Sequence, residues 1–267
     1  MKIGIFDSGL GGLIIAKAVI KKLPKYDYAY LGDTKRVPYG NRSQATVYEF
    51  TRQAVEYLFK KQNCQLIILA CNTASSEALR KIQQSYLPKN FPNRRVLGVI
   101  IPTMETVAED KKNKRVGVLA TSGTVNSHIY KKELKKLTPK IKIVEQAAPL
   151  LVPLAEFDGM QYSDKILKNY LKPLITAKVN KIVLGCTHYP LFSNKIKKIV
   201  GGKVDILSQD KILPGKLKEY LKKHKETDTK LSRNGKRKFL VTDVNQNLKQ
   251  ASGLLFGKSI KFKMVRL

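Results

Sequence analysis

Two cysteines stand at equivalent points of the chain, each where an apolar run ends and a polar turn begins. Cys71 follows the run 65–70 and opens the turn Cys-Asn-Thr-Ala-Ser, and Cys186 follows the run 180–185 and opens Cys-Thr-His-Tyr-Pro. Ligands of parallel α/β sheets bind outside the carboxyl ends of the strands. The N–H groups of a following helix favour a thiolate there, so we expect both thiols to have a pKa below the ordinary value of about 8.5. The alternative for either cysteine alone is a small apolar residue that ends a buried strand.

A pair of thiols that meets in one cleft has a chemistry that a single thiol lacks. A thiolate can remove a proton from one face of a carbon while a thiol returns a proton to the other face, which is racemisation without a cofactor. Cys64 begins an apolar run and has no polar turn, so we interpret it as structural. The three Cys and three His show no zinc-ligand spacing, and we therefore expect no metal.

The elements that must position these thiols alternate between short apolar runs and amphipathic stretches, which predicts an α/β fold with mainly parallel sheets. Residues 43–62 repeat apolar side chains such as Val47 and Leu58 at helical spacing, behind Ser43 as an N-cap. Strands are predicted at 2–6, 27–32, 65–70, 96–100, 115–120, 141–145, 180–185, 204–207 and 238–242.

Two segments recur along the chain at almost the same distance. Residues 2–11 resemble 115–124, a shift of 113 positions, and residues 65–73 resemble 180–188, a shift of 115 positions. Similarity at a fixed offset indicates two related halves. The alternative is that buried strands look alike by chance.

We therefore predict two pseudo-symmetric α/β domains with the active site in the cleft between them. One domain is formed by residues 1–97 plus 208–267, and the other by residues 98–207. The chain crosses between them near 97 and 207, and we expect these crossings to act as hinges on which the lobes close over a ligand.

The charge of the chain is strongly positive, with 51 Lys and Arg against 20 Asp and Glu and a net charge of +31. Lys supplies most of the excess, and Lys suits bidentate phosphate or base contacts less well than Arg. We interpret the excess as a solvated surface. It includes the run 216–238, which is typical of a surface helix followed by a polar loop around Gly235. A nucleic-acid partner needs these charges to cluster and is the alternative.

Apolar residues make up 43% of the chain, enough for a sizeable core. The longest apolar runs, such as 66–71 and 96–102, are too short to span a bilayer, and the first apolar run is interrupted at Asp7. Three cysteines without a disulfide pattern suit a reducing compartment. A cytoplasmic protein with no membrane partner is predicted.

Two further turns follow predicted strands. Asp7-Ser-Gly-Leu-Gly-Gly12 has glycines that let backbone N–H groups approach a small ligand, but it is neither G-x-G-x-x-G nor a Walker loop, so nucleotide binding is not predicted. The turn Pro38-Tyr39-Gly40 can present a phenol and a backbone N–H, and its alternative is an ordinary connecting turn.

Five sequence blocks together resemble bacterial glutamate racemases. The paired cysteines are shared with the wider family that includes aspartate racemase, whereas the Pro-Tyr-Gly turn and the Cys-Thr-His-Tyr-Pro block favour glutamate. The resemblance is strong from residue 3 to about 207 and weaker beyond, and Leu207-Ser-Gln-Asp210 departs from the Asp-Ser-Gly expected near there. The five blocks are Asp7–Gly12, Gly32–Gly40, Cys71–Ser75, Ala120–Thr124 and Gly185–Pro190.

The resemblance implies an enzyme that interconverts L- and D-glutamate with neither pyridoxal phosphate nor metal, and that supplies D-glutamate for peptidoglycan. Cys71 would deprotonate D-glutamate and Cys186 would deprotonate L-glutamate. Asp7, His188 and Glu156 would assist the thiols. The residues expected to line the substrate are Asp7, Ser8, Tyr39, Gly40, Asn72, Thr73, Thr187 and His188, with Thr121 and Thr124 as further carboxylate donors.

Other interpretations stay open at this point. Glu156 is alternatively an ordinary surface residue, and His188 a hydrogen-bonded core histidine. The whole chain is alternatively an aspartate or other amino-acid racemase of the same family, or a basic nucleic-acid- or gyrase-associated protein. A homodimer is compatible with the sequence, which does not fix its geometry.

Overall fold

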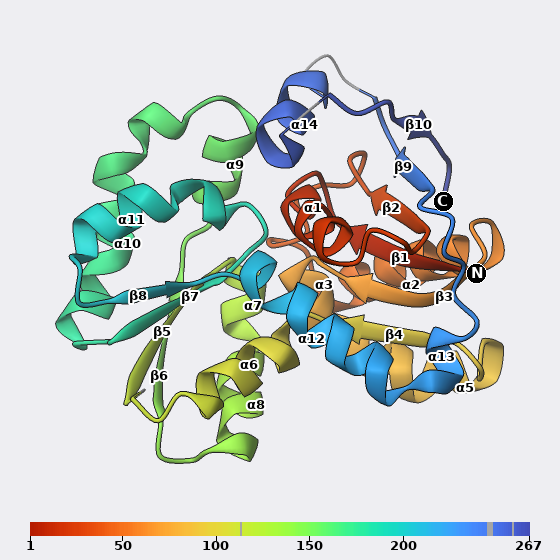
Figure 1. The fold of residues 1–267 in the computed structure, drawn as a ribbon. Coiled ribbons are helices and arrows are strands. Elements are labelled where there is room, and N and C mark those ends of the chain that lie inside the picture. The colour runs from red at the N-terminus through yellow and green to blue at the C-terminus, as the bar shows by residue number, and fades with distance from the viewer. Residues whose placement is uncertain (113, 245–247, 258) are drawn as a thin grey trace.

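The computed structural model describes residues 1–112, 114–244, 248–257 and 259–267. Its strands form two sheets in which every described ladder is parallel. Figure 1 shows the two sheets in two lobes that lie side by side. The strands are β1 (Lys2–Asp7), β2 (Tyr28–Gly32), β3 (Cys64–Leu69), β4 (Arg95–Gly98), β5 (Arg115–Ala120), β6 (Lys142–Ala147), β7 (Lys181–Gly185), β8 (Asp205–Leu207), β9 (Arg237–Val241) and β10 (Lys263–Met264).

The order of strands is repeated between the two sheets. The larger sheet has the order β10-β9-β2-β1-β3-β4 and the smaller one β6-β5-β7-β8, so the first strand of each half lies between the second and the third. This shared topology explains why sequence segments recur at a fixed distance. It confirms the predicted α/β fold with two pseudo-symmetric halves and parallel sheets. The domain boundaries at 97/98 and 207/208 stay a prediction.

Helices cover both faces of the larger sheet. In β1, Ile3 and Ile5 pack with the apolar residues of α1 and α12, whereas Phe6 points to the opposite face and packs with those of α2. The helical segments are α1 (Leu13–Lys22), α2 (Gln44–Lys60), α3 (Asn72–Glu77), α4 (Leu79–Lys81), η1 (Ile82–Tyr86), α5 (Leu87–Asn90), α6 (Ile100–Glu109), α7 (Ser122–Asn126), α8 (Ile129–Leu137), α9 (Leu151–Glu156), η2 (Met160–Tyr162), α10 (Ser163–Thr176), η3 (Tyr189–Phe192), α11 (Ser193–Val200), α12 (Gln209–Lys223), α13 (Lys225–Asp228) and α14 (Leu248–Phe256).

The two halves share one continuous apolar cluster. It runs from Ile3 and Leu217 in the lobe of the larger sheet through Met104 on α6 to Val118 and Tyr130 in the other lobe. Each lobe also has a cluster of its own. The lobes are therefore joined by packed side chains as well as by the two chain crossings.

Most predicted elements are present, with small differences at their ends. Each predicted strand is found, with ends that differ by at most two residues, and Ser43 caps α2 by accepting a hydrogen bond of 3.3 Å from Thr46 N. α12 begins at Gln209, directly after the crossing predicted near 207. β10 and α14 were not predicted. For β10 the reason is that a two-residue edge strand carries too little periodicity to detect. Within the described ranges, no helix is both long and apolar enough to cross a membrane.

Candidate active site

The ends of four parallel strands, two from each half, meet around one cavity. β1 ends at Asp7, β3 leads to Cys71, β5 leads to Thr121 and β7 leads to Cys186. The cavity has a volume of about 50 Å³. Its wall is formed by Ser8, Val37, Pro38, Tyr39, Gly40, Asn41, Cys71, Asn72, Thr73, Thr121, Pro149, Val152, Pro153, Cys186, Thr187 and His188.

Cys71 occupies the N-cap position of α3, and it is buried. Its Sγ donates to Ser8 Oγ at 3.2 Å and accepts from the N–H of Ala74 at 3.4 Å. Burial, followed by the negative charge of Asp7, raises the pKa of Cys71 to about 12, and the two hydrogen bonds only partly oppose this. The prediction that the helix lowers the pKa of this thiol is therefore wrong, because desolvation of a thiolate outweighs one backbone N–H.

Cys186 lies beside an imidazole that is held from its other side by a carboxylate. Cys186 Sγ is 3.9 Å from His188 Nδ1, and His188 Nε2 is 3.1 Å from Glu156 Oε1, an ion-pair distance without the alignment of a hydrogen bond. Burial by itself disfavours the charged ring, but the contacts with Cys186 and Glu156 outweigh burial and raise the pKa of His188 to about 10. Both contacts favour the charged, imidazolium form of the ring.

Asp7 connects the two halves at the end of β1. It is fully buried, its Oδ2 accepts from Gly9 N at 3.1 Å, and its Oδ1 accepts from Thr187 Oγ1 at 3.3 Å. Burial is the largest influence on its carboxyl group and raises the pKa of Asp7, although the positive charge of His188 acts in the opposite direction. A carboxyl group of one half thus contacts the residue that follows the cysteine of the other.

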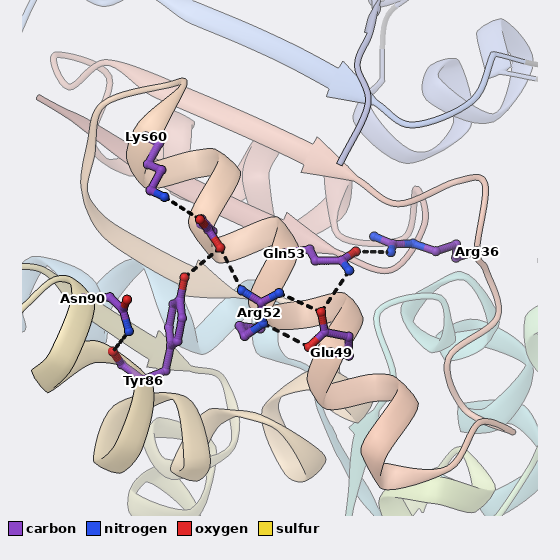
Figure 2. Close-up of polar contacts among 8 residues, drawn as sticks. Arg36, Glu49, Arg52, Gln53, Lys60, Tyr86 and Asn90 are labelled. Atoms are coloured by element: carbon purple, nitrogen blue, oxygen red, sulfur yellow. Dashed lines mark hydrogen bonds and ion pairs between the residues drawn. The ribbon is translucent and has the colours of Figure 1, made fainter.

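The turn 38–40 is held by polar contacts outside the cavity. Tyr39 OH donates to Asp33 Oδ2 at 2.5 Å, and Arg36 Nε donates to the same oxygen at 2.6 Å. Figure 2 shows Arg36 extended toward Gln53 on α2, at one end of a chain of contacts along that helix. The turn that carries Tyr39 and Gly40 is therefore anchored to helix α2 through Arg36.

The polar groups on the cavity wall are mostly neutral. Thr73 Oγ1 lies 3.0 Å from Thr121 Oγ1, and Thr121 Oγ1 donates to Thr124 Oγ1 at 3.1 Å. None of the described residues that form the wall is Lys or Arg. A ligand carboxylate in this cavity would be held by hydroxyl, amide and backbone donors.

The structure brings most of the predicted site residues together. Those that line the cavity are Cys71, Cys186, Ser8, Tyr39, Gly40, Asn72, Thr73, Thr187, His188 and Thr121. Asp7, Glu156 and Thr124 lie outside the wall, and Asp7 and Glu156 each contact a residue that lines it. The apolar part of the wall was not predicted. It consists of Val37 and Pro38, which lie inside the block Gly32–Gly40, and of Pro149, Val152 and Pro153, which lie outside the five blocks.

The roles of these residues stay predictions, as does the absence of a cofactor. Across the part of the chain that the structure describes, no three His, Cys, Asp or Glu side chains are grouped as metal ligands.

Known proteins are similar to this chain over most of its length. The model of the Asp/Glu/Hydantoin racemase family matches residues 14–209. The chain is 38% identical to the glutamate racemase of Sulfurihydrogenibium sp. (strain YO3AOP1), with 100% of this chain and 98% of the relative covered. It is 36% identical to the glutamate racemase of Aquifex aeolicus (strain VF5), with 99% and 97% covered.

Solved structures agree with the sequence relatives. A glutamate racemase isoform from Bacillus anthracis superimposes with a TM-score of 0.89 at 33% identity, covering 100% of this chain and 97% of that one. The glutamate racemase from Francisella tularensis subsp. tularensis SCHU S4, solved in complex with D-glutamate, gives a TM-score of 0.88 at 30% identity, with 99% and 97% covered. The chain is therefore a racemase of the Asp/Glu/Hydantoin racemase family, the family that its five sequence blocks predict.

Proposed function

We propose that this protein interconverts L- and D-glutamate through two thiols, without a cofactor. The observation that carries the proposal is that Cys71 and Cys186, which follow equivalent strands of the two halves, line the same cavity. Thiols that approach a bound α-carbon from two sides can exchange a proton with each of its faces. The full-length relatives named above are glutamate racemases, and one was solved with D-glutamate, which supports glutamate over aspartate as the substrate.

The surroundings of the two sulfurs differ in a way that suits mixed protonation. Burial and the charge of Asp7 keep Cys71 as a thiol, with its proton directed to Ser8 Oγ. The imidazolium of His188 stabilises negative charge on Cys186 Sγ. The reaction of L-glutamate needs a thiolate at 186 and a thiol at 71, and these surroundings support that pair. Cys186 accepts the α-proton, and Cys71 delivers a proton to the opposite face, which gives D-glutamate.

The reverse direction needs the opposite protonation of the pair. Cys71 then accepts the α-proton of D-glutamate, and Cys186 delivers one. We assign assistance at Cys71 to Asp7, whose buried carboxyl group has a raised pKa and can accept the proton that this thiol must lose. Assistance at Cys186 belongs to His188 and Glu156, because their ion pair holds the imidazolium beside the sulfur.

The hydroxyl groups of the wall suit the intermediate of this reaction. Loss of the α-proton leaves a flat carbanion whose charge spreads onto the carboxylate, and prearranged donors stabilise such charge in a site that excludes water. Thr73, Thr121 and Thr187 place hydroxyl groups at the wall. Hydroxyl donors can stabilise this charge without a Lys or Arg side chain on the wall, and the His188 ring lies on the side of Cys186.

In the cell we assign the product, D-glutamate, to peptidoglycan synthesis in the cytoplasm, as the resemblance of the motifs implies. The chain then acts as two domains, each of which carries one thiol to the shared cavity. One domain is formed by residues 1–97 with 208–267, and the other by residues 98–207.

Circular dichroism of amino acids incubated with the purified protein tests the proposal. The optical activity of L-glutamate and that of D-glutamate should each fall to zero, because both reactions end at the same racemic mixture. This should happen with no added pyridoxal phosphate and after treatment with a metal chelator. Aspartate, alanine and glutamine in both forms serve as the comparison panel. Loss of optical activity with aspartate but not with glutamate would overturn the choice of substrate, and no change with any member would overturn the activity.

A further inference from the structure

The side-chain amide of Asn72 is joined to two buried residues outside the cavity wall. Asn72 Nδ2 donates to Gln209 Oε1 at 2.8 Å, and Gln209 Nε2 donates back to Asn72 Oδ1 at 2.6 Å. Tyr130 OH donates to the same Asn72 Oδ1 at 2.6 Å and accepts from Gln209 Nε2 at 2.8 Å. The exposed fractions are 2% for Asn72, 3% for Gln209 and 0% for Tyr130, so water does not compete for these bonds.

The donors and acceptors of this cluster are used almost completely. Gln209 Nε2 donates to Asn72 Oδ1 and to Tyr130 OH, Tyr130 OH donates its single hydrogen to Asn72 Oδ1, and Asn72 Oδ1 accepts from both residues. Asn72 Nδ2 carries two hydrogens, and the bond to Gln209 Oε1 uses one of them. One N–H of a residue that lines the cavity is left for a ligand.

The cluster also couples the orientation of the Asn72 amide to that of the Gln209 amide. A rotation of Asn72 alone by half a turn would set its Nδ2 against Gln209 Nε2, two donors with no acceptor between them. The two amides therefore turn together or not at all. Three elements contribute, since Asn72 begins α3, Tyr130 lies on α8 and Gln209 begins α12.

We propose that Gln209 and Tyr130 are positioning residues, which hold the Asn72 amide so that its spare hydrogen is presented to an acceptor oxygen of the bound amino acid. Neither side chain lines the cavity, so both act through Asn72. The inference rests on the proposed function in one respect, namely that the ligand is an amino acid with carboxylate oxygens.

The test compares three variants with the wild type in steady-state racemisation of both enantiomers. Gln209→Met keeps the length of the side chain and removes all of its hydrogen bonds. Tyr130→Phe removes one hydroxyl group and leaves the paired amides in place. Tyr28→Phe is the matched control, because the hydroxyl of Tyr28 is also buried and bonded, to Leu23 O at 2.9 Å, but lies away from the cavity.

The expected result is a graded rise in KM with little change in kcat. KM for glutamate should rise about tenfold in Gln209→Met and about threefold in Tyr130→Phe, the scale of one neutral hydrogen bond lost or weakened. Tyr28→Phe should keep the KM of the wild type, even though its thermal stability falls by as much as that of Tyr130→Phe. Wild-type KM in both Gln209→Met and Tyr130→Phe overturns the proposal.

A double-variant cycle separates positioning from a structural role. In an Asn72→Ala background, Gln209→Met should cause less than a twofold further fall in kcat/KM, because the amide that it positions is gone. An undiminished fall in that background shows a structural role and overturns the proposal. The same conclusion follows if neither Gln209→Met nor Tyr130→Phe folds.

Calorimetric binding of D-glutamate to the same variants distinguishes this proposal from the proposed function. A wild type that binds D-glutamate without racemising it refutes the function, while the order of affinities among the variants still tests the positioning.

Discussion

Thr187 Oγ1 donates a hydrogen bond of 3.3 Å to Asp7 Oδ1, which joins the residue after Cys186 in one lobe to the last residue of β1 in the other. The cavity beside this bond has a volume of about 50 Å³. A single water needs roughly 10–15 Å³ on this scale, so the space holds a few waters, which is less than an amino acid of glutamate's size requires. We expect the lobes to separate to admit the substrate and to close again around it.

Replacing Gly11 by Ala should prevent this closure. A Cβ at Gly11 would lie 2.5 Å from Thr187 Oγ1 and 2.8 Å from the His188 ring, so the lobes could not approach as they do here. We expect kcat/KM to fall roughly 100-fold, as for other misplacements of about 1 Å in an active site. Small-angle scattering should show that the variant keeps a larger radius of gyration at saturating glutamate than the wild type does.

The control for this prediction is Gly202→Ala, because an added Cβ there meets nothing within 4 Å. Normal turnover in Gly11→Ala would show that the lobes need not come this close for catalysis.

Each of the two cavity cysteines should be indispensable, whereas the third should not. Cys71→Ala and Cys186→Ala each remove the proton carrier of one face, so racemisation should fall by at least about 100-fold in both directions. Cys64→Ala should keep activity, because Cys64 lies in β3 and is absent from the cavity wall. Far-ultraviolet circular dichroism and thermal unfolding of all three variants check that the fold is intact. Near-normal turnover in Cys71→Ala or Cys186→Ala contradicts the two-thiol mechanism.

The stability of the protein should depend on pH through His188. Its folded-state pKa of about 10 lies above the ordinary value of about 6.5. The stabilisation is therefore fully present below about pH 6.5 and is lost as the pH rises through about 10. Urea unfolding of the wild type and of His188→Gln from pH 6 to pH 10 measures this stabilisation. The difference in unfolding free energy between the two proteins should shrink with rising pH. A constant difference would show that the imidazole is not charged in the folded protein.

Glu156→Gln offers an independent check on the same ion pair. Without the carboxylate 3.1 Å from Nε2, the pKa of His188 should fall, so the loss of stability should begin at lower pH than in the wild type. Nuclear magnetic resonance of the ring protons reports the titration directly. An unchanged His188 titration in Glu156→Gln would mean that Cys186 alone holds the charge.

In heavy water, the hydrogen delivered to the product should come from solvent. Starting from L-glutamate, Cys186 removes the α-proton and Cys71 delivers deuterium, and the assignment is reversed for D-glutamate. The two thiols follow strands of different sheets, so they cannot readily hand over the abstracted hydrogen. Mass spectrometry of the separated enantiomers at low conversion decides the matter. Product that retains the substrate's own hydrogen would show that one base serves both faces.

The sequence by itself was sufficient for the fold class and for most of the cavity wall. Buried parallel strands appear as short apolar runs, and polar turns after those runs mark the edge where ligands bind. The blocks around Asp7, Cys71 and Cys186 could be read in this way because each lies within a few residues of a strand end. The repeat between the halves followed from the same local pattern.

What only the tertiary structure decided concerns contacts between residues far apart in the chain. The sequence placed Cys71 before a helix and predicted a lowered pKa, but burial and the charge of Asp7 raise it instead. Glu156 could not be assigned to His188, nor Gln209 to Asn72, because no local periodicity records which side chains far apart in the chain meet. Strand ends and turns follow from short-range sterics and hydrophobicity, which the sequence shows directly. Desolvation and pairing across the cavity depend on how the two sheets pack, and that arrangement exists only in the folded chain.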